Sequence, residues 1–124
     1  MSGAPTVVEC VFHDNEGDGG AAAYCLWYSA AFVGCEFYDN VATYSGGAIY
    51  IEGAQPLITD CVFHDNEAGT SGGAIRFGGW GPGGPGPTIT HCTFYGNTAA
   101  KGGGVYAYAL ESYEAITNCT FYLN

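Results

Sequence analysis

The stretch that decides the fold is Val7-Val8-Glu9-Cys10-Val11-Phe12-His13-Asp14-Asn15, because close copies of it return along the whole chain. Each copy reads apolar-x-x-Cys-x-Phe-x-x-Asn, and the copies occupy residues 7–15, 32–40, 58–66, 89–97 and 116–124. The cysteines of successive copies stand 25, 26, 31 and 27 residues apart. A repeat of this length predicts a solenoid, in which each repeat forms one coil stacked on the next.

A glycine block follows four of the five copies. The blocks are Gly19-Gly20-Ala21-Ala22, Gly46-Gly47-Ala48-Ile49, Gly72-Gly73-Ala74-Ile75 and Gly102-Gly103-Gly104-Val105. The repeats are rich in glycine, aromatic and β-branched residues, and Cys-x-Phe alternates with period two, as strands do. We therefore predict an all-β, single-stranded parallel β-helix of about five coils, with equivalent residues stacked about 4.8 Å apart. Residues 1–124 form one domain, or a fragment of a longer β-helix.

The repeated residues are expected to form internal columns, or ladders. Cysteine and phenylalanine two positions apart share the inner face of a strand, and the asparagine that follows can bond the backbone and the asparagine of the next coil. The glycine pair suits a corner that needs positive φ or a close backbone approach. The predicted ladder residues are Cys10, Cys35, Cys61, Cys92, Cys119, Phe12, Phe37, Phe63, Phe94, Phe121, Asn15, Asn40, Asn66, Asn97 and Asn124.

The combination of Phe-x-x-Asn with Gly-Gly-Ala-(Ile/Leu/Val) resembles the repeat of the polymorphic outer membrane proteins, which are autotransporter-type bacterial surface proteins. The resemblance spans almost the whole chain, and the blocks at residues 46–49 and 72–75 fit it fully. It implies a right-handed parallel β-helix in a secreted or surface-exposed segment, often adhesive. The expected location is therefore extracellular or at the cell surface.

The cysteines allow two interpretations. Neighbouring rungs of the ladder lie at a separation that a disulfide could bridge, but parallel stacking seldom aims both Cβ atoms correctly. Buried free thiols are the favoured interpretation, also for Cys25, which stands outside the ladder. Asn118-Cys119-Thr120 is a weak match to the glycosylation sequon.

Two groups of residues are candidate sites. Asp14, Glu16 and Asp18 alternate ahead of a glycine, as oxygen ligands do in calcium loops, although no acidic residue stands where the loop should end. Calcium is therefore a weak cofactor candidate, and no other cofactor is expected. Trp27, Tyr28 and Trp80 are weak candidates for stacking on sugars, and Trp80 lies in a Gly/Pro-rich loop at 78–87 inserted between two coils.

Composition restricts the function. A formal net charge of −10 disfavours nucleic acid, and no apolar run is long enough for membrane insertion. With only Arg76 and Lys101 as basic residues, a lyase or hydrolase of acidic polysaccharide is improbable, so the chain is expected not to be an enzyme. We expect a structural or adhesive scaffold. Its partners would be adjoining coils of a longer protein, another copy in a head-to-tail filament, or glycans.

Overall fold

The computed structural model describes residues 4–78, 86–108 and 115–124, and these residues form four parallel sheets without any helix. Sheet A stacks β1 (Thr6–Val8), β5 (Ala31–Val33), β9 (Leu57–Thr59), β13 (Thr88–Thr90) and β16 (Ala115–Thr117). Sheet B stacks β2 (Val11–His13), β6 (Glu36–Tyr38), β10 (Val62–His64), β14 (Thr93–Tyr95) and β17 (Thr120–Tyr122).

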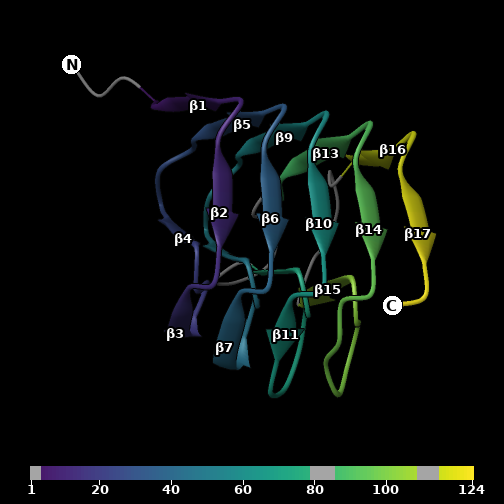
Figure 1. Ribbon diagram of the computed structural model, residues 1–124. Helices are drawn as coiled ribbons and strands as arrows, with labels where there is room; N and C mark the ends of the chain where they lie inside the picture. The colour runs from purple at the N-terminus through teal and green to yellow at the C-terminus, as the bar shows by residue number, and fades with distance from the viewer. Residues whose placement is uncertain (1–3, 79–85, 109–114) are drawn as a thin grey trace.

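The second half of each coil supplies two shorter sheets. Sheet C stacks β3 (Glu16–Gly19), β7 (Val41–Ser45) and β11 (Glu67–Ala68). Sheet D stacks β4 (Ala23–Leu26), β8 (Ile49–Glu52), β12 (Ile75–Gly78) and β15 (Val105–Tyr108). Strands of successive coils lie side by side in chain order, most visibly in sheet B (Figure 1). The predicted all-β parallel solenoid is confirmed, with about four full turns and a fifth half-coil.

Phenylalanine rings fill the interior along the axis of the solenoid. Phe37, Phe63 and Phe94 are fully buried, and neighbouring rings stack nearly parallel with centroids 4.7 and 4.9 Å apart. The in-register pairing of β2, β6, β10, β14 and β17 places these rings one above the other. On the outermost coil Phe121 is 45% exposed, because it has a neighbour on one side only.

An asparagine column runs beside the rings, and Asn40, Asn66 and Asn97 have no exposed surface. Asn66 donates from Nδ2 to Oδ1 of Asn97 at 2.9 Å and to the carbonyl of Phe37 at 3.0 Å. Its own Oδ1 accepts from both the backbone N–H and Nδ2 of Asn40. Each interior amide therefore joins three successive coils and leaves no polar atom of its side chain unpaired.

The bends on both sides of sheet B use the left-handed backbone region even where the residue is not glycine. Asp14, Asp39 and Asp65 follow sheet B with φ between 52° and 54°, and Gly96 takes the same position with φ 64°. Asp and Asn tolerate this conformation better than most residues, which explains the acidic column beside the asparagines. The glycine pair accounts for only one of the corners, where Gly46 and Gly72 have φ 67°.

The first glycine block pairs one residue later than the sequence suggests. Gly20, with φ 60°, corresponds to Gly46, and Ala23 pairs with Ile49. The predicted block at residues 19–22 is therefore wrong by one position. The cause is a shift of register between Gly17 and Gly19. Gly17 pairs with Ala42 and Gly19 with Ser45, so β7 has one more residue than β3 between these two pairs.

Candidate functional site

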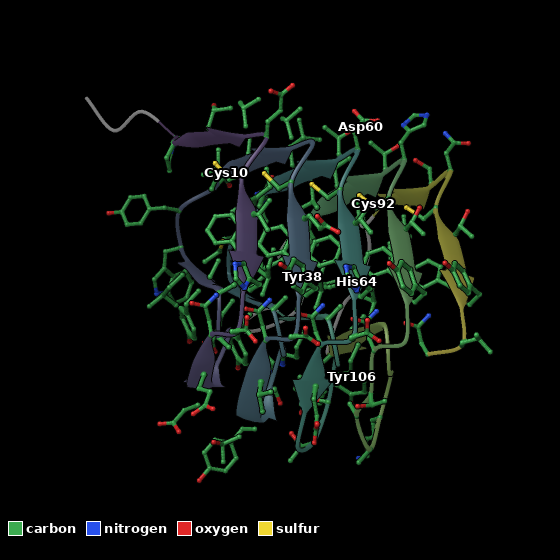
Figure 2. The ribbon with its side chains drawn as sticks, in the orientation of Figure 1. Cys10, Tyr38, Asp60, His64, Cys92 and Tyr106 are labelled. Carbon is green, nitrogen blue, oxygen red and sulfur yellow. The ribbon has the colours of Figure 1, made fainter. Side chains whose placement is uncertain are left out.

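The thiols of the cysteine ladder form hydrogen bonds with the backbone of the solenoid. All six cysteines are free; Cys25, Cys35, Cys61 and Cys92 are buried, whereas Cys10 on the first coil is exposed. The sulfur of Cys61 donates to the carbonyl of Thr59 at 3.2 Å, and Cys92 repeats this contact with Thr90. The sulfur atoms form one row along the solenoid, with Cys10 and Cys92 on it (Figure 2). Burial raises the pKa of the Cys25 and Cys35 thiols, which disfavours the reactive thiolate.

We expect a thiol reagent such as Ellman's reagent to modify Cys10 first in the native chain and Cys119, which is half-buried, more slowly. The four buried cysteines should react only on unfolding, when six thiols become titratable without added reductant. Fewer than six thiols in denaturant would reveal a disulfide and contradict the free ladder.

An aromatic column covers the outer face of sheet B. It consists of His13, Tyr38, His64, Tyr95 and Tyr122. Neighbouring rings are stacked with centroids 4.8 to 5.1 Å apart. Tyr38 and His64 lie side by side on this face (Figure 2). Because each ring covers the next, the column offers mainly ring edges to a ligand.

His64 in this column is held by two carboxylates. Its Nδ1 lies 2.8 Å from Oδ2 of Asp65, and its Nε2 lies 3.1 Å from Oε1 of Glu36 on the preceding coil. Carboxylates only accept hydrogen bonds, so both contacts form together only when the imidazole carries two protons. Burial lowers the pKa of His64, but the hydrogen bonds and charges of Asp65 and Glu36 outweigh burial and raise the pKa overall.

We expect the His64 contacts to stabilise the fold more at low pH than at high pH. Because the pKa of His64 is higher in the folded state than in the unfolded state, protonation of His64 stabilises the fold. This stabilisation is complete below the unfolded-state pKa of about 6.5 and is lost as the pH rises through the folded-state pKa. The difference in unfolding free energy between the wild type and His64→Gln should therefore shrink from about pH 5.5 to about pH 8.5. His91→Gln, which changes a histidine at a bend, is the control; an equal trend in both variants would contradict the assignment.

Sheet D carries a second outward cluster. One column consists of Tyr24, Tyr50, Arg76 and Tyr106, and the column beside it of Leu26, Glu52, Gly78 and Tyr108. The Tyr24 and Tyr50 rings stack at 4.9 Å, and the guanidinium of Arg76 lies 4.5 Å from the Tyr50 ring centroid and 5.8 Å from that of Tyr108. The Tyr24 hydroxyl donates to Oε2 of Glu52 at 2.8 Å. Partial burial, followed by the Glu52 contact, raises the pKa of Tyr24 to about 12.

Two of the predicted sugar-stacking residues adjoin this cluster. Trp27 and Tyr28 directly follow β4 and are 59% and 73% exposed. The Trp27 ring lies over Gly53 of the next coil, where any Cβ would come within 2.7 Å of it. Trp80 and most of the loop at 78–87 lie outside the described residues. We call Trp27, Tyr28, Tyr24, Tyr50, Arg76, Tyr106 and Tyr108 the aromatic face.

Apart from Tyr28, the sequence analysis did not single out the tyrosines of this face. Tyr50, Arg76 and Tyr106 each stand four residues after the first glycine of their blocks, but the one-residue register shift in the first coil places Tyr24 five residues after Gly19 and conceals the shared column. Tyr24, Tyr50, Arg76 and Tyr106 become recognisable as neighbours once β4, β8, β12 and β15 are aligned on their inward residues.

The predicted calcium ligands lie on one short stretch without converging. Asp14 occupies the bend before β3 and contacts Nδ1 of His13, while Glu16 and Asp18 are exposed on β3. Within residues 4–78, 86–108 and 115–124, no three His, Cys, Asp or Glu side chains are grouped as a metal site would require. Calcium binding at Asp14, Glu16 and Asp18 stays a prediction.

The comparisons with known proteins support the fold. A family model described as a right-handed β-helix region matches residues 1–124, which agrees with the expected handedness. No curated protein and no solved structure matches the chain. In the part of the chain that the structure describes, no helix is long and apolar enough to cross a membrane.

Proposed function

We propose that this chain, which belongs to the right-handed β-helix family, is a non-catalytic scaffold of the cell surface or extracellular space with an adhesive or structural role. The main support for the proposal is that the interior polar groups form hydrogen bonds with one another and with the backbone. The buried amides of Asn40, Asn66 and Asn97 bond one another, and the ladder thiols bond backbone carbonyls. These groups hold the coils together and are not directed at a substrate.

The outer surface supports the same proposal. The His64, Glu36 and Asp65 group joins two neighbouring coils on the outer face of sheet B. Catalysis by acid and base groups generally needs a cleft that excludes water and orients a substrate. The resemblance to polymorphic outer membrane repeats, together with the many Gly, Thr, Asn and Tyr residues, favours surface exposure. Cys25, Cys35, Cys61 and Cys92 are buried, and burial protects a thiol in an oxidising environment.

The test is a turnover assay on pectin, alginate and neutral polysaccharides. We expect neither unsaturated uronates nor new reducing ends above the level of a buffer blank. Release of either product that disappears in Arg76→Ala or His64→Gln would replace the scaffold with an enzyme.

Self-assembly is the second candidate, and the chemistry of the terminal rungs favours it. Asn124 accepts from Asn97 through Oδ1 and donates to the carbonyl of Phe94, while Asn15 at the other end donates to Asn40. A second copy stacked head to tail would continue the asparagine and phenylalanine columns, and such a contact does not close into a dimer. It ranks second because, among the described strands, sheet D has four and sheet A has five, so a copy that paired with β16 and β17 would leave β15 without a partner.

Light scattering of the 124-residue chain at micromolar concentration tests this second candidate. Stacking predicts oligomers or filaments that dissociate when Phe121→Lys places a charge on the exposed rung. A monomer at all concentrations would exclude head-to-tail assembly of this chain.

A further inference from the structure

We propose that the aromatic face of sheet D binds neutral oligosaccharides. The inference deepens the proposed scaffold function and rests on it, since it names the ligand class that an adhesive face would take. Three observations support this proposal. They are the position and exposure of Trp27, the lack of a hydrogen-bond acceptor for Arg76 among the described residues, and the negative charge of the chain.

Trp27 stands where the backbone favours glycine. Its φ is 61°, and the equivalent position in the next coil is Gly53 with φ 62°. Glu9, His91 and Leu123 have the same left-handed conformation, so the φ of Trp27 fixes where the indole lies and does not by itself point to a ligand. The indole is 59% exposed, and its ring atoms lie against Gly53 of the next coil. An exposed indole fixed at a strained position is suited to stacking on the C–H face of a sugar ring.

Arg76 supplies directed donors beside these rings. Its guanidinium is positioned by Tyr50 and Tyr108, and one terminal nitrogen lies 3.5 Å from the place that a Cβ on Gly78 would occupy. A Cβ at Gly78 would make ordinary van der Waals contact with the guanidinium, but it would come within 2.9 Å of the carbonyl oxygen of Tyr108. Among the described residues no carboxylate or carbonyl accepts a hydrogen bond from Arg76. Its N–H groups are therefore available to ligand hydroxyls, together with the tyrosine hydroxyls around them.

The charge of the molecule decides between neutral and acidic sugars. The face contains one arginine, whereas Glu52 lies in the adjacent column and the chain carries a formal net charge of −10. Such a field repels polyanions, whereas a neutral sugar meets donors and acceptors without this penalty. Trp27 on the first coil and Tyr108 on the fourth are three coils apart, roughly 14 Å at strand spacing. This span favours an oligosaccharide over a single sugar.

The experiment is affinity electrophoresis and calorimetry of the chain with soluble oligomers of glucose, mannose, xylose and N-acetylglucosamine, and with oligogalacturonate as the charged comparison. We expect at least one neutral oligomer to bind. Trp27→Gly, Tyr108→Ala and Arg76→Gln should each weaken that binding by roughly tenfold or more. Trp27→Gly adopts the residue that the next coil already uses at this position, so it should remain folded.

Tyr44→Ala is the matched control, because Tyr44 is an equally exposed tyrosine on sheet C. It should leave binding unchanged, and circular dichroism should show every variant folded. Failure of all neutral oligomers to bind, tighter binding of oligogalacturonate, or equal losses in Tyr44→Ala and Tyr108→Ala would each overturn the inference. None of these results affects the non-catalytic assignment, which only turnover would overturn.

Discussion

Phe63→Ala is expected to destabilise the chain by about 3–5 kcal/mol, the range for removing a buried aromatic ring from a close-packed core. Phe63 is fully buried between the rings of Phe37 and Phe94, so the substitution leaves a cavity between two coils that cannot close without breaking the stack. Equilibrium unfolding in urea, followed by circular dichroism, measures the loss.

Val62→Ala is the control for Phe63, since Val62 lies on the same strand and faces outward in register with Glu36 and Thr93. It should cost less than about 1 kcal/mol, as expected for a partly exposed side chain. Equal losses in the two variants would mean that the inner and outer faces of sheet B have been exchanged.

Asn66→Ala is expected to destabilise the chain by about 3 kcal/mol or more, although it removes only a small polar group. The substitution takes the acceptor from the backbone N–H and Nδ2 of Asn40, and the donor from the carbonyl of Phe37 and Oδ1 of Asn97. Water cannot reach a fully buried column, so each group left without a partner carries its desolvation cost.

Asn15→Ala makes the same change on the first coil, where the side chain is half-buried and, among the described residues, bonds only to Asn40. It should cost about 1 kcal/mol or less, because solvent can replace the lost contacts. Urea unfolding of the two variants compares an interior rung with a terminal one. Equal costs would show that the asparagines act singly at their bends and not as a continuous column.

The repeat allowed much of the fold to be predicted, for a physical reason. In a parallel solenoid every coil meets the same neighbours, so a residue type that suits one rung suits all of them. The inward columns of cysteine, phenylalanine and asparagine therefore recur at fixed offsets from each cysteine. The positive φ of Asp39 and Asp65 was not foreseen, because an acidic residue after a strand does not by itself reveal a left-handed backbone.

By itself, the sequence determined the all-β solenoid, its inward ladders and the separation of the inner from the outer side of sheet B. Only the tertiary structure decided which outward side chains meet, as in the His64 contacts with Glu36 or the placement of Arg76 between Tyr50 and Tyr108. Outward residue types vary from coil to coil, so the repeat does not show which of them will pair, and the register shift in the first coil displaces Tyr24 relative to its glycine block. Their partners become fixed only when the strands stack at a spacing that brings residues more than twenty positions apart into contact.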